Sequence, residues 1–165
     1  MARPKRAGIQ DDRFDDPLSD YSPPDYVDQM QRALCETPIS DMKHQPFTSV
    51  DAEEPIEKTL ARMDEMNIAC VLVTRDGRLV GILSERDVLD KVADRYEQIH
   101  RDPVHTVMTS DPTAVYATDT PAKALAIMAE GGFRHVPILD VDDQVVGIVG
   151  PRRVNTHLRH CMTQA

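Results

Sequence analysis

The chain carries one sequence pattern twice, and this duplication constrains its fold more than any other feature. Residues 76–83 (DGRLVGIL) return as residues 142–149 (DDQVVGIV), which places Gly81 and Gly147 66 positions apart. Three apolar pairs upstream match at a separation of 65: Leu60 with Leu125, Met63 with Met128, and Ile68 with Phe133. A fixed period of this length indicates a duplicated structural unit, so the apolar face of each half needs the other half to cover it.

In the first half, the spacing of apolar residues predicts a strand, a helix and a hairpin. A short strand is expected over residues 47–50, and Pro55 opens a helix with an apolar stripe. Two β-rich runs, residues 70–73 and 79–83, flank Asp76-Gly77, a dipeptide typical of a two-residue hairpin turn.

A second helix is expected to begin at Ser84 and to bury three apolar side chains: Val88, Leu89 and Val92. The second half repeats this plan with a strand at residues 113–116, a helix at 121–130, a hairpin at 136–149 and a helix at 151–160. Each unit therefore reads β-α-β-β-α, and the fold class is α/β (α+β).

We predict three segments, namely residues 1–35, repeat 1 at 36–100 and repeat 2 at 101–165. Residues 1 to about 23 contain three prolines, five aspartates and almost no aliphatic pattern, which predicts a flexible tail. A short helix is expected from Pro24 to about Leu34, placed to pack on the core or on a partner.

Charge and composition exclude several classes of partner. The net charge is −9 and the isoelectric point is near 5.0, which argues against general affinity for nucleic acid or an anionic membrane. No apolar run approaches the ~20 residues that span a bilayer, and the N-terminus lacks a hydrophobic signal segment. The three cysteines are odd in number and widely spaced, which indicates reduced thiols. We therefore expect a cytoplasmic protein.

Two motifs give the chain a resemblance to a known family. Residues 81–87 (GILSERD) and 133–138 (FRHVPI) lie in register within the duplicated units, and the chain over roughly residues 36–160 resembles a tandem pair of cystathionine-β-synthase (CBS) domains, or Bateman module. The resemblance implies two repeats related by a pseudo-two-fold axis, with two clefts that often bind adenine nucleotides. It also implies that two modules associate, so a homodimer is expected.

Ser84 and Asp87 are the leading candidates for a ligand site. A carboxylate at the Asp87 position can accept two hydrogen bonds from a vicinal diol such as the ribose hydroxyls. The same Ser-x-x-Asp spacing is also a capping box, which stabilises a helix start without any ligand. The resemblance favours the ribose role, because in similar modules the Asp at this position holds the ribose.

The resemblance also implies the rest of the site, by analogy with regulatory kinase subunits that carry such modules. Arg134, His135 and Arg152 would bind phosphate, and Thr109, Pro112 and Ala114 would line the base pocket. The alternative is that Arg134 and Arg152 are ordinary solvated surface charges. We predict that the ligand is AMP, ADP or ATP, and the sequence does not separate these from S-adenosylmethionine.

The second copy departs from the motif. Gly150 and Arg153 stand where the first copy has Ser84 and Asp87, so the hydroxyl and the carboxylate are both replaced. We therefore expect that the second cleft has lost nucleotide binding and that Arg153 fills it. The counterparts of Arg134 and His135 in the first copy are the uncharged Ala69 and Cys70, which makes the expected site asymmetric.

No catalytic or metal site is predicted. His157, His160 and Cys161 share a helical face at spacing 3 and 4, but they lie near a chain end without a fourth ligand. No nucleophile with its base and no P-loop glycines can be assembled, so a hydrolase has little support.

The sequence therefore predicts a regulatory, energy-sensing module rather than an enzyme. It would have no obligatory cofactor, would bind an adenine nucleotide in one cleft, and would pass occupancy to an unknown client protein. The alternative is a ligand-free dimerisation or assembly module of the same fold. The expected dimer contact is apolar and uses the helices that end the repeats: Val88, Leu89, Val92, Val154 and Leu158.

Overall fold

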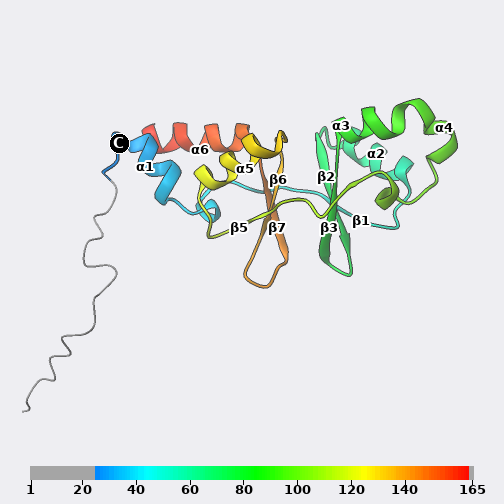
Figure 1. Ribbon diagram of the computed structural model, residues 1–165, viewed down its shortest axis with the longest axis horizontal. Helices are drawn as coiled ribbons and strands as arrows, with labels where there is room; N and C mark the ends of the chain where they lie inside the picture. Colours follow the sequence, from blue (N-terminus) through cyan, green and yellow to red (C-terminus); the bar gives the residue numbers. More distant parts are fainter. Residues whose placement is uncertain (1–24, 164–165) are drawn as a thin grey trace, which may run out of the picture.

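The structure of the chain, a computed structural model, describes residues 25–163. Two units lie side by side, with their helices along one side and their hairpins projecting to the other (Figure 1). The flexible tail expected at residues 1 to about 23 lies outside the described residues. No helix within residues 25–163 combines the length and the apolar character needed to cross a bilayer.

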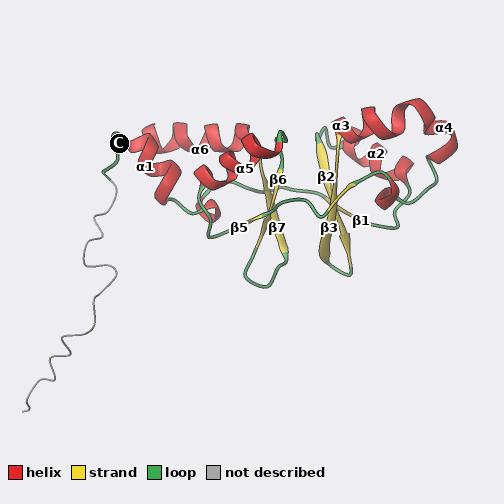
Figure 2. Cartoon of the chain, viewed as in Figure 1, coloured by secondary structure: helices red, strands yellow, loops and turns green. Residues whose placement is uncertain are grey.

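Both units follow the β-α-β-β-α order that the sequence predicts (Figure 2). The first consists of β1 (Ser49–Asp51), α2 (Ile56–Glu65), β2 (Cys70–Arg75) and β3 (Arg78–Ser84), followed by the helical turns α3 (Glu85–Asp87), η2 (Val88–Val92), η3 (Ala93–Arg95) and α4 (Tyr96–Ile99). The second consists of β5 (Val115–Tyr116), α5 (Pro121–Gly131), β6 (Val136–Leu139), β7 (Val145–Val149) and α6 (Pro151–Thr163).

Each unit contributes its own small sheet. The first sheet has the order β1-β2-β3-β4, where β4 (Thr109–Ser110) comes from the start of the second repeat, and the second has the order β5-β6-β7. β1 runs parallel to β2, and β2 runs antiparallel to β3. The pairing of Arg75 with Arg78 leaves Asp76-Gly77 as the two-residue turn, so the predicted hairpin is confirmed.

The two repeats exchange short segments, which the sequence analysis did not foresee. Ile39, in the 3₁₀ turn η1 (Ile39–Asp41), and Met42 are buried in the core of the second repeat. In the same way Val104, in the 3₁₀ turn η4 (Val104–Thr106), and Val107 are buried in the core of the first repeat. The residues at the start of each repeat therefore complete the core of the other repeat.

The exchange explains why the glycine of the duplicated pattern is needed twice. A Cβ atom on Gly81 would collide with the Met108 side chain, and one on Gly147 would lie 2.6 Å from the His44 ring. Met108 and His44 both belong to the exchanged segments, which cross the sheets at these points. Because glycine has no side chain, these two positions leave room for the segment that crosses the sheet.

The expected N-terminal helix is present but starts later than predicted. α1 (Gln29–Glu36) begins after Asp28, whose Oδ1 accepts a hydrogen bond of 2.8 Å from the Gln31 backbone N–H, a standard N-cap. The helix packs on α6 and α5 of the second repeat through residues such as Ala33. Val27, inside the range predicted for this helix, precedes the cap and is 90% exposed.

The apolar side chains expected at a dimer contact are mostly used inside the repeats. Val92 and Val154 are each 1% exposed and belong to the cores of their own repeats, and Val88 and Leu158 pack against the same cores. Leu89, predicted to be buried, is 71% exposed. Residues 88–92 form a π-helical turn, whose wider period directs Val88 and Val92 inward and leaves Leu89 outside.

The exchanged segments should make the two repeats unfold together. Ile39→Ala removes a fully buried side chain from the second core, so we expect a loss of about 2–4 kcal/mol in the free energy of unfolding, with a single transition in urea. The matched control Val27→Ala, at an exposed position, should change it by less than about 0.5 kcal/mol. Two separate transitions would contradict the exchange as a source of cooperativity.

Candidate functional site

Asp87 is the centre of a polar cluster at the end of β3. Its Oδ1 accepts hydrogen bonds from Lys91 Nζ at 2.7 Å and from Thr109 Oγ1 at 2.8 Å. Its Oδ2 accepts from the Ser84 backbone N–H at 2.9 Å and from Ser84 Oγ at 2.6 Å. The structure therefore brings together three of the predicted site residues, Ser84, Asp87 and Thr109, although Thr109 comes from the start of the second repeat.

The helix-capping role of Ser84 is present as well. Ser84 Oγ accepts from the Asp87 backbone N–H at 3.4 Å while the Asp87 carboxylate accepts from the Ser84 backbone N–H, which is a reciprocal capping box. The capping interpretation of this pair is therefore confirmed. A ligand at Asp87 would therefore bind to a carboxylate that also caps the start of the helix.

The cluster changes the acidity of Asp87. Burial of the carboxylate would by itself raise its pKa, but hydrogen bonds from Lys91, Ser84 and Thr109 outweigh burial and hold the pKa below its ordinary value. Asp87 is therefore an anion at neutral pH despite being only 8% exposed. Such a carboxylate is a strong hydrogen-bond acceptor for hydroxyl groups.

Residues of the second repeat lie across from this cluster. Arg86, next to Asp87, donates from Nη1 to the Gly132 backbone carbonyl at 3.4 Å, two residues before Arg134. The charge of Glu85 acts on His135, so the helix start of the first repeat faces the 132–135 loop of the second. This is the arrangement expected for a site shared between the repeats.

His135 is not a cation in this setting. Burial lowers the pKa of its imidazole, the positive charges of Arg134 and Arg153 lower it further, and Glu85 opposes them only in part. At neutral pH the ring is therefore uncharged and offers hydrogen bonds rather than a full charge. Arg134, which is exposed, is the cation on this side of the expected site.

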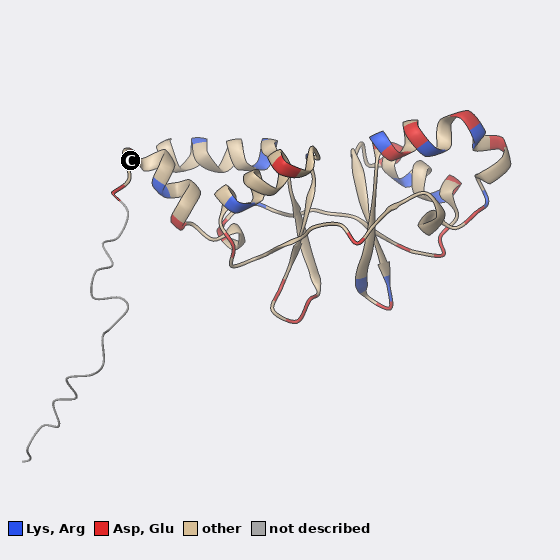
Figure 3. Cartoon of the chain, viewed as in Figure 1, with Lys and Arg blue, Asp and Glu red and all other residues tan. Residues whose placement is uncertain are grey.

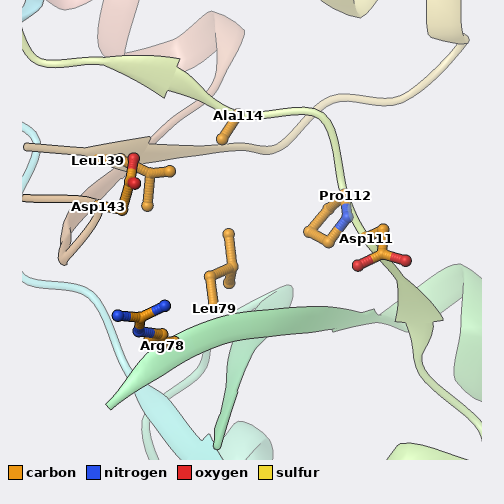
Figure 4. Close-up of a pocket in the computed structure, with 7 residues that line it drawn as sticks. All are labelled: Arg78, Leu79, Asp111, Pro112, Ala114, Leu139 and Asp143. Atoms are coloured by element: carbon orange, nitrogen blue, oxygen red, sulfur yellow. The ribbon is translucent and has the colours of Figure 1, made fainter.

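Pro112 and Ala114 line a cavity of about 270 Å³ between the two hairpins. Leu79 points into it from β3, and Pro112 and Ala114 face it from the segment that leads to β5 (Figure 4). Arg78, Asp111, Leu139 and Asp143 complete the wall. The volume is just below the roughly 300–1,000 Å³ usual for small-molecule sites.

This cavity and the Asp87 cluster lie toward opposite ends of β3. Leu79 lines the cavity and Ser84 belongs to the cluster, and five residues of strand span about 17 Å. The segment from Thr109 to Ala114 runs between them, first paired with β3 and then turning toward β5. The two parts of the expected site are therefore connected by one segment but separate in position.

Arg152, predicted to bind phosphate, lies elsewhere. It lines a separate hollow of about 710 Å³ beside α1, together with Met30, Asn155, Thr156, Leu158, Arg159 and Met162. Consecutive residues on an α-helix point about 100° apart, and the neighbouring Arg153 reaches the Pro46 carbonyl instead. Arg152 is not among the hydrogen-bond donors to Asp87.

The second cleft is closed to a Ser side chain at the position that matches Ser84. A Cβ atom on Gly150 would lie 2.8 Å from the Arg134 backbone carbonyl and 3.6 Å from the His135 ring. A contact of 2.8 Å with backbone is closer than real Cβ atoms come. Gly150 therefore permits the close approach of the 134–135 loop to the start of α6, and a residue with a hydroxyl does not fit there.

Arg153 reaches the segment that precedes β1. Its Nη2 donates to the Pro46 backbone carbonyl at 2.6 Å, and its charge acts on the buried Cys70 thiol. Its Nη1 is buried and has no hydrogen-bond partner, and no other buried side-chain nitrogen or oxygen of the described residues lacks one. The guanidinium thus lies against the 46–47 segment, at the place that corresponds to Pro112 in the first cleft.

The cysteines and histidines do not form a second site. Burial raises the pKa of the Cys70 thiol to about 12, so it is a poor nucleophile. His157 Nε2 lies 3.6 Å from Cys161 Sγ, but no group of three metal-binding side chains occurs in the part of the chain that the structure describes. Acidic and basic residues alternate along α3, η2 and η3, and acidic residues lie in the β6–β7 turn (Figure 3).

Comparison with protein families identifies both repeats. A family model described as the CBS domain matches residues 39–94 and 104–160, together more than half of the chain. CBSCBSPB1 of Arabidopsis thaliana, a CBS domain-containing protein, is 32% identical over 123 residues, which cover 74% of this chain and 22% of that protein. CBSCBSPB5 of the same organism is 31% identical over 100 residues, 61% of this chain and 18% of its own length. The chain therefore spans only about a fifth of these relatives.

Solved structures share the fold. The CBS-domain protein ATU1752 of Agrobacterium tumefaciens has a TM-score of 0.66 and 27% identity, and the match covers 73% of this chain and 98% of that one. CBSX2 of Arabidopsis thaliana has a TM-score of 0.69 and 21% identity, covering 78% and 98%. PAE2072 of Pyrobaculum aerophilum, complexed with AMP, has a TM-score of 0.66 and 23% identity, covering 77% and 99%.

The Asp87 cluster should make stability depend on pH. Because the folded pKa of Asp87 is below the ordinary value of about 3.9, its contribution is complete above about pH 5 and is lost as the pH falls through 3.9 toward the folded value. Asp87→Asn should therefore cost about 1.5–3 kcal/mol at pH 7 and progressively less toward pH 3. Urea unfolding across this range measures the difference. A constant difference, or the same trend in Asp64→Asn at an exposed position, would contradict the assignment.

Proposed function

The chain belongs to the CBS domain family, and we propose that it is a regulatory module that binds one adenine nucleotide in the cleft at Asp87. In this proposal the Asp87 carboxylate accepts the ribose hydroxyls, with Ser84 and Thr109 beside it. Arg134 and the neutral His135 receive the phosphate from the second repeat. The base lies against the segment that runs from Thr109 toward Pro112, on the side nearest to Asp87.

The observation that carries this proposal is the difference between the two clefts. One presents an ionised Asp87 with Ser84 and Thr109, whereas the other presents Arg153 and a glycine that excludes a side chain. A carboxylate can accept hydrogen bonds from both hydroxyls of a diol, whereas a guanidinium can only donate to the hydroxyl oxygens. The AMP-bound structures of PAE2072 and CBSX2, which share the fold, support a nucleotide as the ligand.

The charges of the three predicted phosphate ligands favour a nucleotide with few phosphates. With Arg152 beside α1 and His135 uncharged, Arg134 is the predicted phosphate ligand that brings a positive charge to this side. One guanidinium can form a bidentate pair with one phosphate group. We therefore propose AMP ahead of ADP and ATP.

Occupancy would reach a client protein through the exchanged segments. Thr109 directly follows Val107 and Met108, which pack against the core of the first repeat, and the segment then continues into β5 of the second. A ligand that moves Thr109 would change how the two repeats meet. We propose that an unidentified client protein binds differently to the two arrangements of the repeats. We place this interaction in the cytoplasm, because free cysteines such as the three in this chain are typical of reducing compartments.

An assembly module without a ligand is the second candidate, since the Asp87 cluster is self-sufficient as a helix cap. Its homodimer would use Leu89, which is the one exposed member of the five apolar residues expected at the contact. A two-fold contact of this kind is the commonest closed arrangement. Sedimentation velocity of the full chain with and without AMP separates the two candidates: a dimer that is unaffected by AMP and binds none supports assembly.

Three variants test the proposed ligand site by calorimetric titration with AMP and adenosine. Asp87→Ala should weaken both ligands by about 5- to 150-fold, because it removes hydrogen bonds to the ribose worth ~1–3 kcal/mol. Arg134→Ala should weaken AMP and spare adenosine, which has no phosphate. Arg153→Ala, in the other cleft, should leave both affinities nearly unchanged.

The matching measurement is the unfolding free energy of each variant without ligand, because Asp87→Ala also removes part of a helix cap. A larger loss of affinity from Arg153→Ala than from Asp87→Ala would place the site in the other cleft.

A further inference from the structure

The Lys91 ammonium is fixed at the centre of the Asp87 cluster. Nζ lies 2.7 Å from Asp87 Oδ1, 3.2 Å from the Met108 backbone carbonyl and 3.4 Å from Thr109 Oγ1. An ammonium group has three protons, so each is matched by one acceptor. The side chains of Lys91 and Asp87 are 37% and 11% exposed, so the pair is less hydrated than an ordinary surface ion pair.

The Asp87 carboxylate has no free acceptor position for a ligand. Its two oxygens receive four donors, from Lys91, Thr109 and twice from Ser84, and a carboxylate offers about four lone-pair positions. The bond from the Ser84 backbone N–H to Oδ2 belongs to the capping box, and the Ser84 hydroxyl donates to the same oxygen at 2.6 Å. A ribose diol that binds at Oδ1 must therefore displace Lys91 and Thr109.

The local backbone lets Lys91 leave without disturbing the core. Lys91 lies in the π-helical turn η2, four residues after Asp87, and this kind of turn is often found at functional sites. Val88 and Val92 of the same turn face the core and hold the backbone. The ammonium is at the end of a flexible side chain that is partly exposed, so it can move into solvent alone.

We propose that Lys91 is a built-in competitor of the nucleotide at Asp87. This inference rests on the proposed function, because it concerns the same carboxylate. In the ligand-free chain the ammonium occupies Oδ1; when the ribose binds, its hydroxyls take this position and Lys91 moves outward. Because the ion pair must be broken before the ribose can bind, it raises the ligand concentration needed to fill the site. Lys91 acts through Asp87 and is therefore a positioning residue.

The test is Lys91→Met, which keeps the length of the side chain and removes its charge. We expect adenosine to bind about 3- to 10-fold more tightly, because no ion pair must be broken, while the melting temperature without ligand falls. If Lys91 had only a structural role, Lys91→Met would lower both the affinity for adenosine and the melting temperature. Lys58→Met, at an exposed position on α2, makes the same change in net charge and should alter neither.

Calorimetric titration of both variants and of the wild-type chain with adenosine and AMP gives distinct results. Tighter adenosine in Lys91→Met, or binding by that variant alone, supports the competitor role. Unchanged adenosine with weaker AMP would show that Lys91 binds phosphate instead, and would overturn the inference while leaving the proposed function intact. No binding of either ligand by any of the three proteins would overturn both.

Discussion

The exchange of short segments between the repeats is the constraint on which the rest of the structure depends. Ile39 and Met42 complete the second core, and Val104 and Val107 complete the first, so neither repeat has a full core without residues that belong to the other. The segment after Val107 then supplies Thr109 to Asp87. The packing that stabilises the fold therefore also assembles the polar cluster.

The same architecture is used differently at its two pseudo-equivalent positions. At the end of β3 a serine and an aspartate make a reciprocal cap, and the aspartate stays ionised because its neighbours donate four hydrogen bonds. At the end of β7 a glycine allows the loop at Arg134 to approach closely, and Arg153 reaches the opposite segment. Duplication provided two clefts of similar backbone, and a few side chains give them opposite hydrogen-bonding character.

The periodic features of this fold could be predicted from the sequence, and the long-range ones could not. The 66-residue period and Asp76-Gly77 located the hairpins, because pattern and turn chemistry are local properties. The apolar pair at Ile39 and Met42 is equally visible, but nothing in its spacing says which repeat it enters. The exposure of Leu89 could not be predicted either. The prediction that Leu89 is buried assumed the period of an α-helix, but residues 88–92 form a π-helical turn.

The site shows the same limit. The resemblance led us to Asp87 and Thr109, which are joined in the structure, but Lys91 was missed although it stands four residues after Asp87, the spacing at which helical side chains meet. Arg152 was assigned to phosphate, but it lines the hollow beside α1, and a step of about 100° around the helix separates it from Arg153. Orientation around a helix thus carries information that motif matching alone did not use.

The central claim is that the Asp87 cleft binds one nucleotide and that Arg153 fills the corresponding position of the second repeat. Counting the bound ligands tests this claim most directly. Native mass spectrometry of the full chain, titrated with AMP into the millimolar range, reports how many nucleotides each chain retains and whether the chain is a monomer or a dimer. Our account predicts one AMP per chain, lost in Asp87→Ala and retained in Arg153→Ala. Two AMP per chain, or one that disappears only in Arg153→Ala, would contradict it.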